Sequence, residues 1–428
     1  MSEVATAGLP ATWVRSEGSP PASDLTVEAL GFAPHLSFFP ALLARRGVTT
    51  LEEARAFLDP VIGDLHDPFL LDGMDAAVDR LLRARDGGER VVIVGDYDVD
   101  GVSATAILVA VFGACGIQSE PILPHRVHDG YGFQKVQVER AAELGAGVIV
   151  TADCGSTSIE AASEALARGI DVVVTDHHLP DRPHDRRVIE INPHQESSGY
   201  PFRHLSGSGL AFKLASALAS RAGRPVAPEL LLRVSCLGTI ADMVPLEGEN
   251  RVIARVGLEA LASTKAPGLT SLMDVAGVRL PLDASDVGFR LGPRINAAGR
   301  MDSAHVALDL LLERDFTRAA EIAAQLDAWN AERRQAELKV VEEAQTWVED
   351  LPELPAILVA ASTEWHRGVV GIAAGRIARR YHRPTILLAE EGGLATGSGR
   401  SVEGIHLHGF LADWRDRLDR FGGHAQAI

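Results

Sequence analysis

The stretch Gly95-Asp96-Tyr97-Asp98-Val99-Asp100-Gly101 places three carboxylates within five residues. It directly follows the apolar run 91–94, which predicts a buried strand, so the acids lie where this strand gives way to a helix. Carboxylates crowded this closely repel one another, and a bound divalent cation offsets their charge. The stretch therefore predicts a metal site at the end of a strand.

Two further strand ends carry residues of the same kind. The apolar run 147–152 ends in Asp153, and the run 171–174 leads into Thr175-Asp176-His177-His178. Ligands of open parallel sheets bind outside the carboxyl ends of the strands, so three such ends in succession are expected to converge on one crevice. A single Asp after a strand is otherwise a turn former or a helix N-cap, and for Asp153 or Asp176 alone this alternative stays open.

Expected strands and helices alternate from residue 89 to about 200. The strands are expected at 90–95, 117–123, 147–152, 171–175 and 187–192, and the helices at 102–115, 136–144 and 157–168. This alternation is typical of a doubly wound α/β domain with a parallel sheet.

A helical region and a second α/β unit follow. Residues 315–350 are charged and contain neither Pro nor Gly, which predicts one long helix, or two, joining domains; an ordinary bundle helix fits the pattern nearly as well. Strands are then expected at 355–361, 384–390 and 394–399, with a helix at 368–380. We therefore divide the chain into an N-terminal region 1–80, a catalytic domain 81–310, a connecting helix 311–350 and a smaller α/β domain 351–428.

Composition bounds the class of protein. With 428 residues, 46% of them apolar, the chain can build two or three cores. Cys115, Cys154 and Cys236 lack CxxC spacing, which argues against disulfides and structural zinc and fits a reducing cytoplasm. The N-terminus has no signal-peptide core, and the longest apolar stretch, 104–115, is too short to span a bilayer. We expect a soluble cytoplasmic protein without membrane contact.

The formal net charge of −17 argues at first against a nucleic-acid partner, because affinity for phosphates rests on Lys and Arg. Metal-ligating carboxylates would explain part of this acidity. Residues 363–428 contain nine Arg against seven Asp or Glu, hence a net charge of +2. The charge balance therefore leaves a polyanionic substrate open.

The three acid-bearing motifs resemble the first, third and fourth motifs of the DHH phosphoesterase superfamily. They read GDYDVDG at 95–101, TADCGS at 151–156 and TDHH at 175–178. Further stretches resemble the RecJ family of bacterial single-strand-specific exonucleases: LHDPFLL at 65–71, DGYGF at 129–133, GTIADMVPL at 238–246, RLGPRINAAGRM at 290–301, GSGRS at 397–401 and GGH at 422–424. The resemblance runs from about residue 65 to the end of the chain.

This resemblance implies both a fold and a function. The implied fold is α/β, with a doubly wound parallel-sheet DHH domain joined by a long helical segment to a smaller α/β DHH-associated (DHHA1) domain that is cut short at its C-terminal end. The implied function is 5′→3′ exonucleolytic hydrolysis of single-stranded DNA in recombination and DNA repair. We expect a monomer that cooperates with a helicase and a single-strand-binding protein.

The residues themselves indicate the metal. A site rich in Asp oxygens, with one or two imidazoles and no thiolate, suits Mn²⁺ or Mg²⁺, and two such ions about 4 Å apart can clamp the attacking and leaving oxygens of a phosphodiester. By resemblance the ligands are Asp96, Asp98, Asp100, Asp153, His177 and Asp242, with Asp153 bridging both ions. Smaller relatives of the superfamily carry a His where this chain has Val92. Asp100 is expected to take the place of that His as a metal ligand. Asp242 alone could instead be a helix-terminal acid.

Other residues receive roles beside the metals. Asp176 and His178 are placed to orient ligands or to protonate the leaving oxygen, two roles that the sequence does not separate. The expected substrate-binding residues are Arg294, Arg300, Ser398, Arg400 and His424. A planar guanidinium binds phosphate in a bidentate manner, with a surface ion pair as the alternative for Arg294 and Arg300. The glycines around Ser398 let backbone amides approach an anion, and by resemblance this unit grips the 5′ end.

The sequence leaves two roles open for each of three aromatic side chains. Trp365 can stack on a base or pack in a core. His125 and His128 can be solvated loop residues or contact the substrate.

Two other functions compete with an exonuclease. A DHH-family oligonucleotidase or cyclic-dinucleotide phosphodiesterase shares the metal site, but the N-terminal region, the third acid of the first motif and the long joining segment disfavour it. A scaffold that has lost its metals is disfavoured because every expected ligand position is filled. Hydrolysis rates on long strands and dinucleotides, and metal content after purification, separate these alternatives.

Overall fold

The computed structural model describes residues 22, 24–125, 129–130, 132–419 and 426–428. The predictions made for His128 and His424 lie outside the described residues. Within the described residues, no helix combines the length and the apolar composition needed to cross a membrane.

The elements follow the order expected from the sequence. The elements before the first sheet are η1 (Pro34–Leu36), α1 (Phe39–Ala44), α2 (Leu51–Leu58), η2 (Ile62–Asp64), η3 (Pro68–Leu70) and α3 (Met74–Gly87), and α3 crosses the expected boundary at residue 80. The α/β region contains β1 (Arg90–Gly95), α4 (Val99–Ala114), β2 (Ser119–Ile122), α5 (Lys135–Glu143), β3 (Ala146–Ala152), α6 (Ile159–Ala167), β4 (Asp171–Thr175) and β5 (Ile189–Ile191).

Helices make up the middle of the chain, and a unit with a small sheet follows them. The helices are α7 (Gly207–Arg221), α8 (Pro228–Ala241), α9 (Gly248–Ala262), α10 (Pro267–Val275), α11 (Ala284–Asp286), the π-helical η4 (Val287–Leu291), α12 (Gly292–Met301), α13 (His305–Leu312) and α14 (Phe316–Glu349). The last unit contains β6 (Leu358–Ser362), α15 (Val370–Tyr381), β7 (Thr385–Glu391), β8 (Leu394–Arg400), α16 (Leu407–Ala412) and η5 (Arg415–Arg417).

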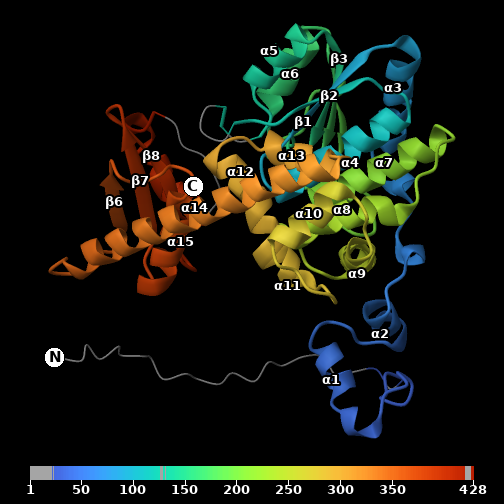
Figure 1. Cartoon of the computed structure of the whole chain (residues 1–428), viewed down its shortest axis with the longest axis horizontal. Helices are drawn as coiled ribbons and strands as arrows, with labels where there is room; N and C mark the ends of the chain where they lie inside the picture. The colour runs from blue at the N-terminus through green and yellow to red at the C-terminus, as the bar shows by residue number, and fades with distance from the viewer. Residues whose placement is uncertain (1–21, 23, 126–128, 131, 420–425) are drawn as a thin grey trace.

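The first sheet has five parallel strands in the order β2-β1-β3-β4-β5. The three central strands, β1, β3 and β4, read as apolar runs because both faces of the sheet are buried there, whereas the edge strands β2 and β5 carry Glu120 and Glu190. Ile93 and Val150 belong to the core that includes residues of α3, α4 and α7, whereas Val94 and Val172 belong to the core that includes residues of α5 and α6. Figure 1 shows these two groups of helices on opposite sides of the sheet.

The sheet order brings the three acid-bearing strand ends together. β1, β3 and β4 are neighbours, and their backbone pairing continues one residue past the strands: Asp96 N donates to Ala152 O at 3.2 Å, and Asp153 N donates to Thr175 O at 3.0 Å. The expected convergence of these ends is therefore confirmed.

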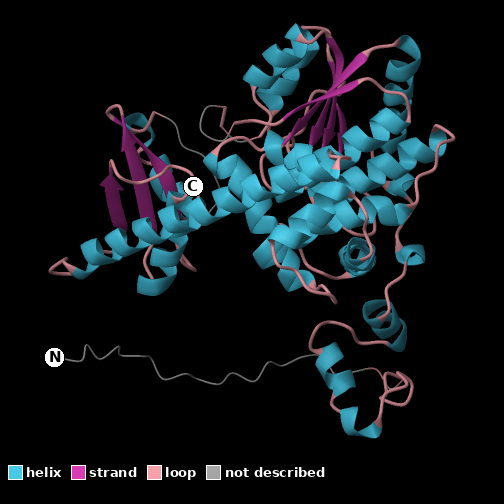
Figure 2. Ribbon diagram, viewed as in Figure 1, coloured by secondary structure: helices cyan, strands magenta, loops and turns pink. Residues whose placement is uncertain are grey.

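The residues 315–350 contain one long helix, α14, of 34 residues. At 1.5 Å per residue it is roughly 50 Å long, and Figures 1 and 2 show it running from the helical layer to the small sheet. Val340 and Ala344 of α14 share a core with Val370 of α15 and Leu387 of β7. In the small sheet, β7 pairs with β6 in parallel and with β8 in antiparallel. The expected fold class is thus confirmed.

Helix α4 begins earlier than the sequence pattern indicates, at Val99 rather than residue 102. The carboxylate of Asp98 accepts hydrogen bonds from Asp100 N at 2.9 Å and Gly101 N at 3.1 Å, which satisfies two amides of the first turn. The acidic stretch therefore lies partly inside the helix, and its own carboxylate caps that helix.

Candidate metal centre

The predicted ligands lie together outside the carboxyl ends of β1, β3 and β4. Three groups each offer ligand atoms within 4.8 Å of one another: Asp96, Asp98 and Asp153; Asp100, His177 and Asp242; and Asp153, His177 and His178. All six predicted ligands belong to at least one group. Asp153 is the carboxylate shared by two of them, and His177 is the imidazole shared by two.

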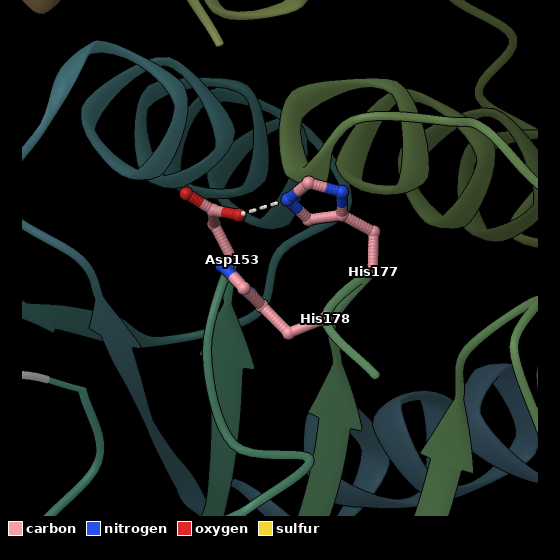
Figure 3. A group of neighbouring side chains, drawn as sticks. All are labelled: Asp153, His177 and His178. Carbon is pink, nitrogen blue, oxygen red and sulfur yellow. Dashed lines mark ion pairs between the residues drawn. The ribbon is translucent and has the colours of Figure 1, made fainter. Parts of the chain in front are cut away.

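The contact between Asp153 and His177 is the centre of this arrangement. Figure 3 shows the carboxylate of Asp153 facing the His177 ring, with Oδ1 3.1 Å from Nε2. Asp153 is 2% exposed and has a φ of 64°, and a Cβ on the neighbouring Gly207 would overlap its carboxylate. Apart from the ion pair that they form with each other, neither Asp153 Oδ1 nor His177 Nε2 makes a hydrogen bond among the described residues. Two buried ligand atoms that make no such bond fit a bound cation.

Burial and mutual repulsion shift the pKa values of these acids upward. Burial, followed by the charges of Asp100 and Asp98, raises the pKa of Asp153 well above its ordinary value. Burial and the same two charges raise the pKa of Asp242 to about 8. Burial and Asp100 also raise the pKa of Asp98. A divalent cation would restore the ionised form of such acids, so the electrostatics fit the oxygen-ligated metal expected from the sequence.

Asp100 has a structural role in addition to the predicted ligation. Its Oδ2 accepts a hydrogen bond from Gly207 N at 2.6 Å, and its Oδ1 accepts one from Ser208 N at 2.9 Å, at the N-terminus of α7. Oδ2 also lies 4.0 Å from Nε2 of His177. Because each carboxylate oxygen has two lone pairs, these bonds leave room for a metal. A Cβ on Gly238 would overlap Oδ1, which explains why α8 carries glycine there.

Asp176 binds the loop that carries the two histidines. Its Oδ1 accepts hydrogen bonds from His177 N at 2.8 Å and His178 N at 3.1 Å and lies 2.7 Å from His178 Nδ1; its Oδ2 accepts one from Ser156 N at 2.8 Å. Burial would raise the pKa of Asp176, but the bond to His178 and its charge lower it to about 2. Burial would lower the pKa of His178, but Asp176 raises it to about 9. Of the roles left open for Asp176, these contacts favour orientation.

Two asparagines that the sequence analysis passed over support the same loops. Asn192, 1% exposed, donates from Nδ2 to His178 O and to Ser156 Oγ, both at 2.8 Å. Asn296 of α12 accepts from Val99 N at 3.2 Å, at the first residue of α4. Asn192 directly follows β5, so the rule applied to the other strand ends could have found it. Asn296 lies between Arg294 and Arg300 in the motif at residues 290–301, where only the two arginines were predicted to bind substrate.

The two predicted phosphate clamps of α12 differ in their contacts. The guanidinium of Arg294 donates to Asp327 Oδ1 at 2.9 Å and to the carbonyls of Arg290 and Val275, which favours the ion-pair alternative because it ties α12 to α14. Arg300 donates from Nη1 to the carbonyl of Gly368 at 3.1 Å, which joins α12 to the loop before α15.

Ser398 and Arg400 lie on β8, with their side chains on the α15 side of the sheet. Arg400 Nη1 donates to Ser398 Oγ at 2.7 Å, and Ser398 Oγ donates to the backbone oxygen of Ile428 at 2.6 Å. Both are half-buried. Trp365 is 7% exposed in the core of α14 and α15, and its Nε1 donates to Glu343 at 2.7 Å, so packing is the better explanation for it. His125 N donates to Asp129 Oδ2 at 2.8 Å.

Comparison with known families matches both α/β units. Residues 90–239 match the DHH family, N-terminal domain, and residues 355–428 match the DHHA1 domain. The single-stranded-DNA-specific exonuclease RecJ of Bacillus subtilis (strain 168) is 40% identical over 90% of this chain. The match covers 49% of that relative, so the chain spans about half of its length. The RecJ exonuclease of Dickeya dadantii (strain 3937) is 41% identical over 91% of this chain and 71% of that protein.

Solved structures agree with these matches. A crystal structure of exonuclease RecJ bound to manganese has a TM-score of 0.75 at 34% identity, over 83% of this chain and 89% of that one. RecJ from Thermus thermophilus in complex with Mn²⁺ has a TM-score of 0.80 at 31% identity, over 96% of this chain and 58% of that one. With the sequence motifs, the converging strand ends and these relatives in agreement, the chain belongs to the RecJ family of DHH proteins.

Proposed function

We propose that the chain is a metal-dependent exonuclease that hydrolyses phosphodiester bonds of single-stranded DNA from the 5′ end. The observation that carries this proposal is the convergence of five aspartates and His177, which includes two buried ligand atoms without hydrogen-bond partners among the described residues. RecJ relatives named as single-stranded-DNA-specific exonucleases, and RecJ structures bound to Mn²⁺ or Mg²⁺, support it.

Different residues of the chain have different roles at this site. Two Mn²⁺ or Mg²⁺ ions would be held by Asp96, Asp98, Asp100, Asp153, His177 and Asp242. When bound, such ions activate water and neutralise charge on the phosphodiester oxygens. Asp176 fixes the loop of His177 and His178 through its backbone amides. His178 has its Nδ1 2.7 Å from the carboxylate of Asp176 and belongs to the group with Asp153 and His177, where its ring can donate a proton to a leaving oxygen.

The small α/β unit and Arg300 of α12 supply the substrate contacts in this proposal. Ser398 and Arg400 offer a hydroxyl, a guanidinium and nearby backbone amides to a 5′ phosphate, with Arg300 and His424 as further contacts. We retain the division of the chain at residues 1–80, 81–310, 311–350 and 351–428. Helix α14 lies inside the third of these segments, whereas α3 continues across the first boundary. Family membership supports a role in recombination and DNA repair. A cytoplasmic monomer that works with a helicase and a single-strand-binding protein completes the proposal.

The test uses end-labelled oligonucleotides with the purified chain and Mn²⁺. We expect release of label from a single strand, little from a blunt duplex of the same sequence, and none without the metal. Asp153→Asn removes the negative charge of the shared ligand while keeping the side-chain size, and Asp413→Asn, exposed directly after α16, is the control. Faster hydrolysis of a dinucleotide or a cyclic dinucleotide than of a long strand would favour the oligonucleotidase alternative.

A further inference from the structure

Helix α12 touches the loop that carries the first metal-binding motif. Besides the hydrogen bond between Asn296 and Val99, a Cβ built on Gly299 would lie 2.8 Å from the carbonyl oxygen of Tyr97. Real Cβ atoms are essentially never found this close to a neighbour. The backbone of α12 therefore lies directly against the backbone that holds Asp96 and Asp98.

The next residue of α12, Arg300, contacts the small α/β unit. Arg300 donates from Nη1 to the carbonyl of Gly368, and a Cβ built on Gly368 would overlap the carbonyl oxygen of Arg300. Each backbone thus closes against the other with no side chain between them. Figure 1 shows α12 in the part of the helical layer that faces the small sheet.

A third close approach continues into that sheet. Gly371 lies in the first turn of α15. A Cβ built on it would be only 3.1 Å from Ser398 Oγ and 3.5 Å from Arg400 Nη2. Three glycines, Gly299, Gly368 and Gly371, hereafter the glycine path, therefore lie at the successive close contacts between the first motif loop and the Ser398–Arg400 pair. The contacts of Gly299 and Gly368 are with backbone atoms, and those of Gly371 are with side chains.

We propose that the glycine path fixes the spacing between the metal centre and the Ser398–Arg400 pair, and that Gly368 is the positioning residue that sets it. The inference rests on the proposed function, because it concerns a DNA strand bound at the metal centre and at the Ser398–Arg400 pair at the same time. A phosphate anchored at β8 reaches the metals correctly only if the two units keep their separation. A misplacement of about 1 Å far from the chemistry can lower a rate about a hundredfold.

The test compares Gly368→Ala with Gly375→Ala, a matched change in the same unit where the new Cβ would meet only Arg400 Cγ at an ordinary 3.6 Å. Each variant is assayed on two substrates. A 5′-phosphorylated single strand must bind both the metal centre and the Ser398–Arg400 pair, whereas bis(p-nitrophenyl) phosphate, a small diester, binds only the metal centre. Mn²⁺ stoichiometry is measured in parallel. We expect Gly368→Ala to lower kcat on the strand about a hundredfold with little change in KM, while its hydrolysis of the small diester and its Mn²⁺ content stay at wild-type levels.

The outcomes separate this inference from the proposed function. Equal losses on both substrates would overturn the spacing role, because a merely structural defect affects both. Wild-type kcat on the strand in Gly368→Ala would overturn it as well. If the wild-type protein with Mn²⁺ cut no strand, the proposed function would fail first. Should circular dichroism show Gly368→Ala to be unfolded, Gly371→Ala makes a milder change on the same path and must show the same selective loss.

Discussion

The carboxylate of Asp100 accepts a hydrogen bond at 2.6 Å from the amide of Gly207, which lies 107 residues further along the chain. Its second oxygen accepts one from Ser208, so the acid ties the first turn of α4 to the first turn of α7. Asp153 is equally buried, but its Oδ1 makes no hydrogen bond within the described residues. Two acids of one predicted ligand set therefore differ in what they contribute to the metal-free fold.

Asp100→Ala should destabilise the metal-free protein, by about 3 kcal/mol in the free energy of unfolding, because two buried amides lose a charged acceptor. Urea denaturation in the presence of a chelator measures this. An unchanged free energy of unfolding would mean that water or another acceptor replaces the carboxylate.

Asp153→Ala should act in the opposite direction on stability and abolish cleavage. Removing a buried acid that repels Asp100, Asp98 and Asp96 relieves charge repulsion, so the melting temperature of the metal-free protein should hold or rise. The loss of a ligand shared by two groups should lower Mn²⁺ content. A variant that kept more than about a tenth of the wild-type rate with unchanged metal stoichiometry would contradict the bridging role.

Arg294→Ala should weaken the fold rather than DNA binding. Its guanidinium bonds to Asp327 and to two backbone carbonyls, and their loss should cost about 1–3 kcal/mol of unfolding free energy. A double-mutant cycle with Asp327→Ala isolates the ion pair, and a labelled oligonucleotide measures the dissociation constant. Unchanged stability together with strongly weakened strand binding would restore the phosphate-clamp assignment.

Arg400→Ala should weaken recognition of the 5′ end more than the chemistry. One charge-assisted phosphate contact is worth on the order of 1.5–3 kcal/mol, and its loss should appear mainly in the KM for a 5′-phosphorylated strand. Arg379→Ala, exposed on α15, is the control. Equal losses on 5′-phosphorylated and 5′-hydroxyl strands would refute the assignment.

Acid should weaken a contact between α13 and the sheet. Nε2 of His305 accepts a hydrogen bond from Leu123 N at 3.1 Å, and burial lowers the pKa of His305, so the fold favours the neutral ring. The stability from this contact is present above the unfolded pKa of about 6.5 and is lost as pH falls through the lower folded pKa.

Melting temperatures between pH 8 and pH 5 test this. The decline toward low pH should be smaller in His305→Gln, whose amide oxygen accepts without titrating. His35→Gln, exposed in η1, should leave the decline unchanged. The same decline in all three proteins would assign the pH dependence to other groups.

The sequence by itself determined the parallel sheet and the chemistry at its edge. Apolar runs with an acid at their carboxyl ends are local patterns, and parallel pairing brings those ends together, so Asp96, Asp153 and Asp176 could be placed in one crevice from the sequence. Charge and spacing within the long segment also indicated a helix, although its continuity over 34 residues was seen only in the structure.

Tertiary structure alone decided what each side chain does with its hydrogen bonds. The second role of Asp100, the pairing of Arg294 with Asp327, the support that Asn192 gives to His178, and the burial of Trp365 join residues 14 to 107 positions apart. No local pattern encodes such contacts, because they depend on how helices pack against the sheet. The glycine path is of the same kind: a glycine in a sequence signals conformational freedom, and only the packed molecule shows which backbone lies against it.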